Sequence, residues 1–357
     1  METRKTTSAE RVDFAPGYSI ATIINGCWQL TPDHGGGPGS EKDIHRVFAD
    51  LVDHGFTTFD CADIYVGVEE TIGRFRRTLS NPHQIQIHTK YAPNKDTLHL
   101  LTPQDVDNAV DRSLTRLGVD RLDLLQFHWW DYEVPGQDMM VDRLQRAQRA
   151  GKIRLLGVTN YDTAHVRALV DCGTELISIQ SQYSLLDRRP EKKMAVFCEE
   201  KAMHIFPYGV LAGGFLSERY LGQAAPETHD RSMNRSLQKY RLIIDEVGGW
   251  DIYQSLLSTL HDIARKHEVH LTTIAARWVL DQPSVPAIIL GVGSTSRAAQ
   301  NVSIGRLHLD DDDHAQIAAQ LATHSVIPGD PYGIERDVEG RHARLIKTNL
   351  HDEDIHK

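Results

Sequence analysis

Eight short apolar runs, each of strand length, alternate with helical patterns along most of the 357-residue chain. The runs are apolar throughout, which is typical of parallel strands buried on both faces. Alternating strands and helices predict a parallel α/β fold, and eight such units predict a (β/α)8 barrel, the TIM barrel. A doubly wound open sheet would need a glycine-rich turn after the first strand, and no turn there has that spacing. The eight runs are Ile20–Ile24, Thr57–Phe59, Ile85–His88, Leu122–Phe127, Ile153–Val158, Ile177–Ile179, His204–Pro207 and Ala287–Leu290.

The segments between the runs carry helix signals. Val106, Val110 and Leu114 recur at helical spacing, and Thr102-Pro103 precedes them as an N-cap and first helical residue. We expect a single domain over residues 1–357, with the barrel core at about residues 20–305 and a C-terminal extension at about 306–357. Residues 212–250 contain few strand signals and predict a long loop after the seventh strand.

Charge and cysteine content restrict the partners and the compartment. Lys and Arg number 39 against 49 Asp and Glu, a net charge of −10, which disfavours nucleic acid and anionic membrane surfaces as partners. The longest apolar runs are far shorter than the roughly 20 residues that span a bilayer. The four cysteines form no C-x-x-C pair and predict free thiols in a reducing compartment. The N-terminus lacks an apolar secretion segment, so we expect a cytoplasmic protein.

Chemically capable side chains follow nearly every predicted strand. Asp60 and Tyr65 follow the second strand, Lys90 ends the third, and His128 follows the fourth. Because the carboxyl ends of barrel strands meet at one rim, we expect these four residues to gather there. A lysine ammonium would lower the pKa of Tyr65 from its ordinary value of about 10, and Asp60 would hold Lys90 as an ion pair. With His128 hydrogen-bonded to a substrate carbonyl oxygen, the group suits a general acid that protonates a developing alkoxide.

A second kind of site is indicated after the eighth strand. The turn Gly291–Ser296 precedes a helix, so its backbone N–H groups are available to an anion, and Arg297 adds a positive charge. In barrels, the loops after strands seven and eight often hold phosphate. A tight turn with a Ser or Thr cap is the equally open structural alternative. Four basic residues of the preceding long loop are further candidate phosphate contacts, although a solvated loop explains most of them: Arg231, Arg235, Lys239 and Arg241.

Seven motifs, in order along the chain, resemble those of the aldo-keto reductase family. The order Asp60, Tyr65, Lys90, His128 and the spacing of the first two are those of the family, and the likeness covers about residues 20–305. The motifs are Gly26-Cys27-Trp28, Phe59-Asp60-Cys61-Ala62-Asp63-Ile64-Tyr65, Thr89-Lys90, Asp123-Leu124-Leu125-Gln126-Phe127-His128, Gly157-Val158-Thr159-Asn160, Gln180 and Tyr208.

The resemblance implies a barrel that binds an extended nicotinamide dinucleotide and reduces carbonyl groups, with the hydride coming from the cofactor. It implies that Tyr65 is the general acid/base, that Lys90 and Asp60 tune it, and that His128 orients the carbonyl. Trp28 and Trp129, with Tyr65 and His128, would form the substrate pocket. The implied cofactor contacts are Gly26, Cys27, Trp28, Thr159, Asn160, Gln180, Tyr208, Gly209, Leu211, Gly291, Gly293, Ser294, Arg297, Gln300 and Asn301.

The choice between NADPH and NADH, and the identity of the substrate, follow less directly from the sequence than the fold does. Many family members carry a basic residue immediately after strand eight, where this chain has Gly291 and Val292, but Arg297 matches a second phosphate-binding position. NADPH is therefore favoured over NADH. The expected reaction is NAD(P)H-dependent reduction of an aldehyde or ketone, a small-molecule carbonyl substrate. The segment 325–357 matches no substrate-defining tail, and no oligomeric state follows from the sequence.

Several alternatives remain beside this interpretation. The same four residues would serve an NAD(P)⁺-dependent sugar or alcohol dehydrogenase, or a cofactor-binding regulatory subunit with slow turnover. Tyr91 and Lys95 have the spacing of a short-chain dehydrogenase pair, but Pro93 between them opposes the required helix. Asp60 and Asp63 lie three residues apart without accompanying histidines, so we expect no metal site.

Overall fold

Eight parallel strands form a nearly closed barrel in the computed structural model, which describes residues 8–31, 39–228 and 233–346. The strands are hydrogen-bonded in the order β10-β3-β4-β5-β6-β7-β8-β9, and the Ile205 N–H in β9 donates to the Ser284 carbonyl (2.7 Å) just before β10. The predicted (β/α)8 fold is confirmed. The barrel strands are β3 (Ile23–Gly26), β4 (Thr58–Asp60), β5 (Gln86–Tyr91), β6 (Leu122–Phe127), β7 (Ile153–Thr159), β8 (Ser178–Gln182), β9 (His204–Tyr208) and β10 (Ile288–Gly291).

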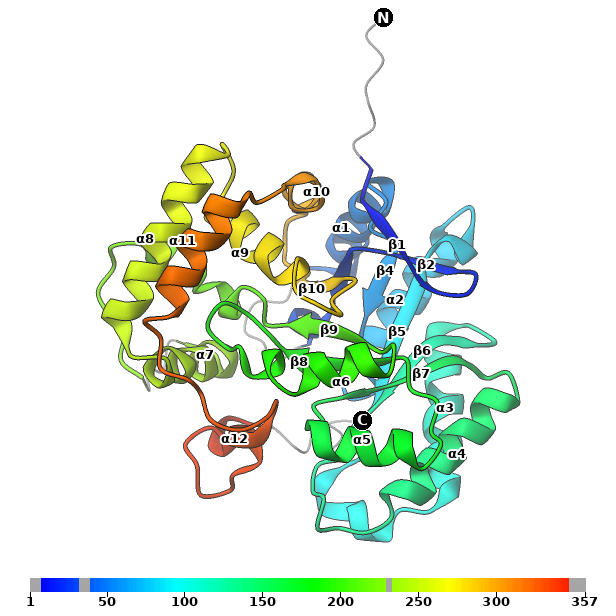
Figure 1. Cartoon of the computed structure of the whole chain (residues 1–357). Helices are drawn as coiled ribbons and strands as arrows, with labels where there is room; N and C mark the ends of the chain where they lie inside the picture. Colours follow the sequence, from blue (N-terminus) through cyan, green and yellow to red (C-terminus); the bar gives the residue numbers. More distant parts are fainter. Residues whose placement is uncertain (1–7, 32–38, 229–232, 347–357) are drawn as a thin grey trace, which may run out of the picture.

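Helices cover the outside of the sheet (Figure 1). α3 begins at the expected signals: Thr102 forms a capping box with Asp105, Pro103 opens the helix, and Gly118 closes it with a left-handed backbone (φ 66°). The helices are α1 (Glu41–Asp53), α2 (Val68–Thr78), α3 (Pro103–Leu117), α4 (Gln137–Arg149), α5 (Thr163–Asp171), α6 (Met194–Glu200), α7 (Arg235–Glu246), α8 (Trp250–Lys266), α9 (Leu271–Leu280), α10 (Ala298–Arg306), α11 (Asp311–Leu321) and α12 (Gly333–Arg336).

The first predicted strand needs a correction. Residues Ile20–Ile24 are divided at Thr22 between two elements: β2 (Tyr18–Ala21) pairs antiparallel with β1 (Arg11–Ala15), and only β3 enters the barrel. Both halves are apolar because both are buried, so hydropathy alone does not separate them. The hairpin lies at the amino-terminal ends of the strands, where Arg154 of β7 donates to the Gly17 carbonyl (2.7 Å).

The segment after β9 is also more ordered than a long loop. Residues 212–250 include α7, whose first turn is capped by the Asn234 side chain accepting from the Leu237 N–H (2.9 Å). Its buried side, which includes Tyr240, Leu242 and Ile243, joins the hydrophobic interior. This helix faces the carboxyl-terminal rim and supplies part of the site described below.

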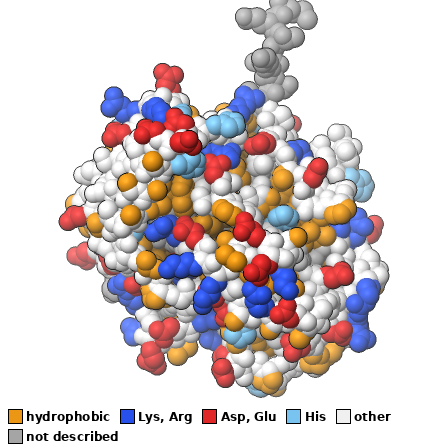
Figure 2. All heavy atoms as spheres, viewed as in Figure 1, with side chains coloured by type: hydrophobic (Ala, Val, Ile, Leu, Met, Phe, Trp, Pro, Cys, Tyr) orange, Lys and Arg blue, Asp and Glu red, His pale blue; other side chains and the backbone are white. Residues whose placement is uncertain are grey.

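The strand register brings the predicted chemical residues to one end of the barrel. Gly26 lies beside Asp60, Thr159 beside Gln180, and Gln182 beside Tyr208, all at or near the carboxyl ends of their strands. Figure 2 shows acidic and basic side chains interspersed over the visible face. Within residues 8–31, 39–228 and 233–346, no helix is long and apolar enough to cross a membrane.

Candidate active site

Asp60 and Lys90 form a buried ion pair at the rim. The Lys90 Nζ donates to Asp60 Oδ2 and to the Cys61 carbonyl, both at 2.7 Å, and each charged side chain is 6% exposed. Burial opposes the lysine charge, but Asp60 and Tyr65 together hold the pKa of Lys90 above its ordinary value. Gln180 steadies the other carboxylate oxygen, Oδ1, through a 2.7 Å hydrogen bond. Lys90 is therefore a fixed positive charge.

Tyr65 lies over this cation. The Lys90 Nζ is 5.1 Å from the centroid of the Tyr65 ring, and the ring packs against Trp28 with centroids 4.7 Å apart. Burial raises the pKa of Tyr65 to about 12, and Lys90 opposes that rise only in part. The predicted lowering of the tyrosine pKa is thus not seen, because desolvation outweighs the charge of Lys90. The phenol is protonated at neutral pH and can act as a proton donor.

His128 has a defined tautomer. Its Nδ1 lies 2.9 Å from the Thr159 carbonyl oxygen, which can only accept, so Nδ1 carries the proton. Burial and the nearby Arg336 guanidinium lower the pKa of His128 to about 3, so the ring is neutral and its Nε2 has a free lone pair. That Nε2 is buried without a hydrogen-bond partner. A hydrogen bond from His128 to a carbonyl oxygen would require a proton on Nε2, so the neutral ring accepts there instead.

The predicted catalytic residues border one large cavity of about 1110 Å³. Small-molecule sites commonly occupy about 300–1,000 Å³, so this cavity has room for a dinucleotide and a substrate together. On its wall, the Tyr208 hydroxyl donates to Asn160 Oδ1 (2.8 Å). The sequence-predicted residues that line it are Gly26, Trp28, Asp60, Tyr65, Lys90, His128, Thr159, Asn160, Gln180, Tyr208, Gly209, Leu211, Gly291, Gly293 and Arg297.

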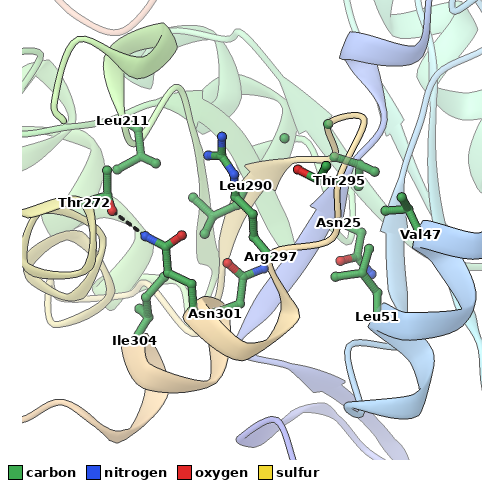
Figure 3. Close-up of a pocket in the computed structure, with 14 residues that line it drawn as sticks. Asn25, Val47, Leu51, Leu211, Thr272, Leu290, Thr295, Arg297, Asn301 and Ile304 are labelled. Atoms are coloured by element: carbon green, nitrogen blue, oxygen red, sulfur yellow. Dashed lines mark hydrogen bonds between the residues drawn. The ribbon is translucent and has the colours of Figure 1, made fainter. Parts of the chain in front are cut away.

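A small pocket adjoins this cavity after β10 (Figure 3). Leu211, Gly291 and Arg297 border both spaces, so the two are continuous along the rim. Gln300 and Asn301, on the first turn of α10, line the small pocket, and the Gln300 side-chain amide donates to Thr272 Oγ1 (2.7 Å). The predicted phosphate turn and the predicted cofactor contacts Gln300 and Asn301 therefore lie together.

Three predicted residues lie outside these spaces. Trp129 is fully buried in the hydrophobic core, where its Nε1 donates to the Val134 carbonyl (3.2 Å), and Trp130 lines the cavity in its place. Cys27 points into the core with a hydrogen bond to the Asn25 carbonyl (3.5 Å). Ser294 is exposed on the turn and borders neither space. Adjacent residues after a strand point to different sides, and the local turn decides which one faces the cavity.

The sequence missed the contribution of the C-terminal extension. Tyr332 lines the cavity and packs edge-on against His128, with ring centroids 5.7 Å apart. Arg336 reaches the rim through hydrogen bonds to backbone carbonyls. The Asp330-Pro331-Tyr332-Gly333 turn marks the segment, but no periodicity there indicates what it contacts.

The basic residues after β9 divide into three groups. Arg235 and Lys239 line the large cavity, and Arg241 pairs with Asp245. Arg231 lies outside the described residues. Among the described residues, no group of His, Cys, Asp or Glu is arranged to hold a metal ion.

Comparison with known proteins identifies similar chains. The Aldo/keto reductase family model matches residues 22–322. Protein tas of Escherichia coli is 26% identical, over 80% of this chain and 90% of that protein. The NADH-specific methylglyoxal reductase of Escherichia coli is 27% identical, over 60% of this chain and 63% of that protein. The solved structure of a glycerol dehydrogenase from Gluconobacter oxydans superposes with a TM-score of 0.69 at 24% identity, covering 92% of this chain and 98% of the other.

Proposed function

This chain belongs to the aldo/keto reductase family of oxidoreductases, and from that premise we propose that it reduces aldehyde or ketone groups to alcohols with NADPH. Tyr65 acts as the general acid in this proposal. The observation that carries it is the juxtaposition of the Tyr65 ring and the Asp60–Lys90 ion pair on the wall of a cavity that His128 also borders. A buried proton donor beside a fixed cation is what protonation of a developing alkoxide needs.

The residues along the cavity fit an extended dinucleotide. Amide and hydroxyl groups of Thr159, Asn160 and Gln180, with the Tyr208 ring, would meet the nicotinamide end. Gly209 and Leu211 follow them. Gly291, Gly293 and Arg297 would meet phosphates, and Gln300 and Asn301 the adenine. When bound, a reduced nicotinamide supplies the hydride.

The protein's own residues supply the proton that the carbonyl oxygen needs. The Tyr65 O–H bond breaks as its proton moves to the carbonyl oxygen, which gains a new O–H bond. Lys90 stabilises the phenolate that remains, and Asp60 keeps Lys90 charged and in place. His128 presents an Nε2 lone pair, so it accepts a hydrogen bond from a substrate or product hydroxyl. Trp28, Trp130 and Tyr332 form aromatic walls of the cavity beside these groups.

The opposite direction is the second candidate, because the His128 tautomer suits binding of an alcohol substrate. An Nε2 acceptor suits the hydroxyl of an alcohol or sugar, which an NAD(P)⁺-dependent dehydrogenase would oxidise. Both directions use the same tyrosine and lysine. Activity with alcohols and oxidised cofactor, but not with carbonyls and reduced cofactor, would select the second candidate.

Titration of tryptophan fluorescence with NADPH and with NADH tests the proposal, followed by a panel of aldehydes, ketones and aldoses. We expect quenching by NADPH and then oxidation of the cofactor with one class of carbonyl. Tight cofactor binding without turnover of any carbonyl or alcohol would contradict the enzyme proposal and indicate a regulatory subunit.

The four free cysteines support the cytoplasmic location that we propose.

A further inference from the structure

The C-terminal extension places an arginine against the backbone that holds His128. α12 is a four-residue helix whose last residue, Arg336, is half-buried. Its Nη2 donates to the Trp129 carbonyl (2.8 Å) and to the Asn160 carbonyl (2.9 Å), and its Nη1 reaches the Trp130 carbonyl at 3.4 Å. One guanidinium therefore joins the segment after β6 to the segment after β7.

Those two segments are the ones that orient His128. Trp129 follows His128 directly, and Asn160 follows Thr159, whose carbonyl accepts the His128 Nδ1 proton. Asn160 has a left-handed backbone (φ 59°), a conformation that asparagine tolerates better than most residues with a side chain. The hydrogen bond from Arg336 to the Asn160 carbonyl adds a restraint on that conformation.

The anchor of α12 is separate from this contact. Glu335, the preceding residue, is buried and accepts two hydrogen bonds from Arg189 (2.8 and 3.0 Å), and Lys239 lies 3.4 Å away. Arg189 is also paired with Asp187. Glu335 thus fixes the helix in place, which leaves Arg336 free to bridge the rim, where its guanidinium packs 4.0 Å over the Tyr132 ring.

We propose that Arg336 is a positioning residue for the reaction, which holds the backbone on both sides of His128, at Trp129 and Asn160, in its active arrangement. This inference rests on the proposed function, because it gives His128 a part in catalysis. A second positive charge next to Arg336 is unfavourable, so the arginine acts in the same direction as burial on the pKa of His128. Around the ring, Trp130 and Tyr332 are uncharged, and Lys90 has its charge balanced by Asp60.

Substitution of Arg336 by Gln and by Lys tests the proposal, with Arg341→Gln as the matched control. Arg341 is an arginine of the same extension, but it pairs with Glu246. We expect Arg336→Gln to lower kcat by about tenfold or more, the factor that corresponds to 1.4 kcal/mol of lost positioning, with the cofactor Kd changed less than about twofold. Arg336→Lys keeps the charge but not the bridge, so it should restore the pKa of His128 and only part of kcat. Arg341→Gln should leave both unchanged.

NMR titration of the histidine rings gives a readout that does not depend on turnover. The His128 signal is assigned by its absence in His128→Gln. We expect the pKa of His128 to rise by about one unit or more in Arg336→Gln relative to the parent protein. An unchanged His128 titration, or an equal loss of kcat in Arg341→Gln, would overturn the proposal. If Arg336→Gln does not fold, Arg336→Lys with a wild-type kcat would overturn it as well. A parent protein that reduces no carbonyl would instead contradict the proposed function, while the titration still decides whether Arg336 acts on His128.

Discussion

Lys90 is the residue on which the local chemistry depends. Its ammonium is buried, and Asp60 is the carboxylate that balances it. Removing one partner of such a pair leaves the other as an uncompensated buried charge, which costs more than an intact pair contributes. Because Lys90 also lies over the Tyr65 ring, the same change removes the group that would stabilise a phenolate.

Lys90→Met should therefore lower both stability and activity. We expect a loss of about 3–5 kcal/mol in the free energy of unfolding, measured by urea denaturation, and a fall in kcat of about 10²-fold or more. Lys201→Met is the control, since Lys201 forms a surface pair with Asp171 and should change stability by less than about 0.5 kcal/mol. Equal effects of the two substitutions would contradict the buried-pair account.

His128 makes a prediction about pH. Since burial and Arg336 lower its pKa to about 3, the ring is almost wholly neutral between pH 5 and 8. The profile of kcat/KM for carbonyl reduction should then show no inflection near the ordinary histidine value of about 6.5 between pH 5 and 8. An inflection near pH 6.5 that disappears in His128→Gln would mean that the ring titrates normally, against this account.

Substitution of Arg297 tests whether this residue binds the 2′-phosphate of NADPH. Arg297 is exposed at the start of α10, on the wall between the two pockets. A charge-assisted hydrogen bond to the 2′-phosphate of NADPH is worth about 1.5–3 kcal/mol, so Arg297→Ala should weaken NADPH binding by about tenfold or more. NADH lacks that phosphate and should bind nearly unchanged. Equal losses for both cofactors in fluorescence titrations would exclude the proposed role.

Among the elements, the barrel strands were predictable and the C-terminal extension was not. A buried parallel strand produces a continuous apolar run in the sequence, as in Leu122–Phe127, where the predicted and observed bounds agree. The extension is held by contacts between residues far apart in sequence, such as Arg189 with Glu335 and Arg336 with Trp129. Contacts between residues far apart in the sequence leave no local pattern, so the contribution of Tyr332 to the cavity could not be predicted.

Substitution of Glu335 tests whether its ion pair holds the C-terminal extension in place. Its carboxylate is fully buried against Arg189 and Lys239, so Glu335→Ala breaks the buried Arg189–Glu335 pair. We expect a loss of about 3–5 kcal/mol in the free energy of unfolding and faster proteolysis of the extension. Glu339→Ala, at an exposed position of the same segment, should change neither. Proteolysis at equal rates in both variants would show that the ion pair does not anchor α12.

The whole molecule has a net negative charge, but the charged side chains that line its large cavity are mainly positive. The chain carries a charge of −10, but the described residues that line the large cavity include five cationic side chains, Lys90, Arg219, Arg235, Lys239 and Arg297. Asp60 balances Lys90 and Glu335 balances Lys239, so the three arginines supply the excess positive charge. A cleft lined by one sign of charge concentrates ligands of the other sign. Composition alone could not predict this, because the fold gathers cations from distant segments onto one rim.

The rim itself follows from barrel topology. All carboxyl ends of the strands lie on one side, so the order of residues along the sequence was enough to predict that Asp60, Tyr65, Lys90 and His128 border one cavity. The directions of individual side chains were harder to predict, as Trp129 and Trp130 show. The cofactor and catalytic roles of these residues stay predictions, and Tyr65 is the residue on which they depend most.

Comparison of Tyr65→Phe with the parent protein is the most direct test, with cofactor binding and carbonyl reduction measured on the same samples. Phenylalanine keeps the ring against Trp28 and removes only the proton donor. We predict that kcat falls by about 10²–10⁴-fold, the contribution typical of general acid catalysis, while the NADPH dissociation constant changes less than about twofold. A variant that reduces carbonyls at the parent rate would contradict the assignment of Tyr65 as the general acid.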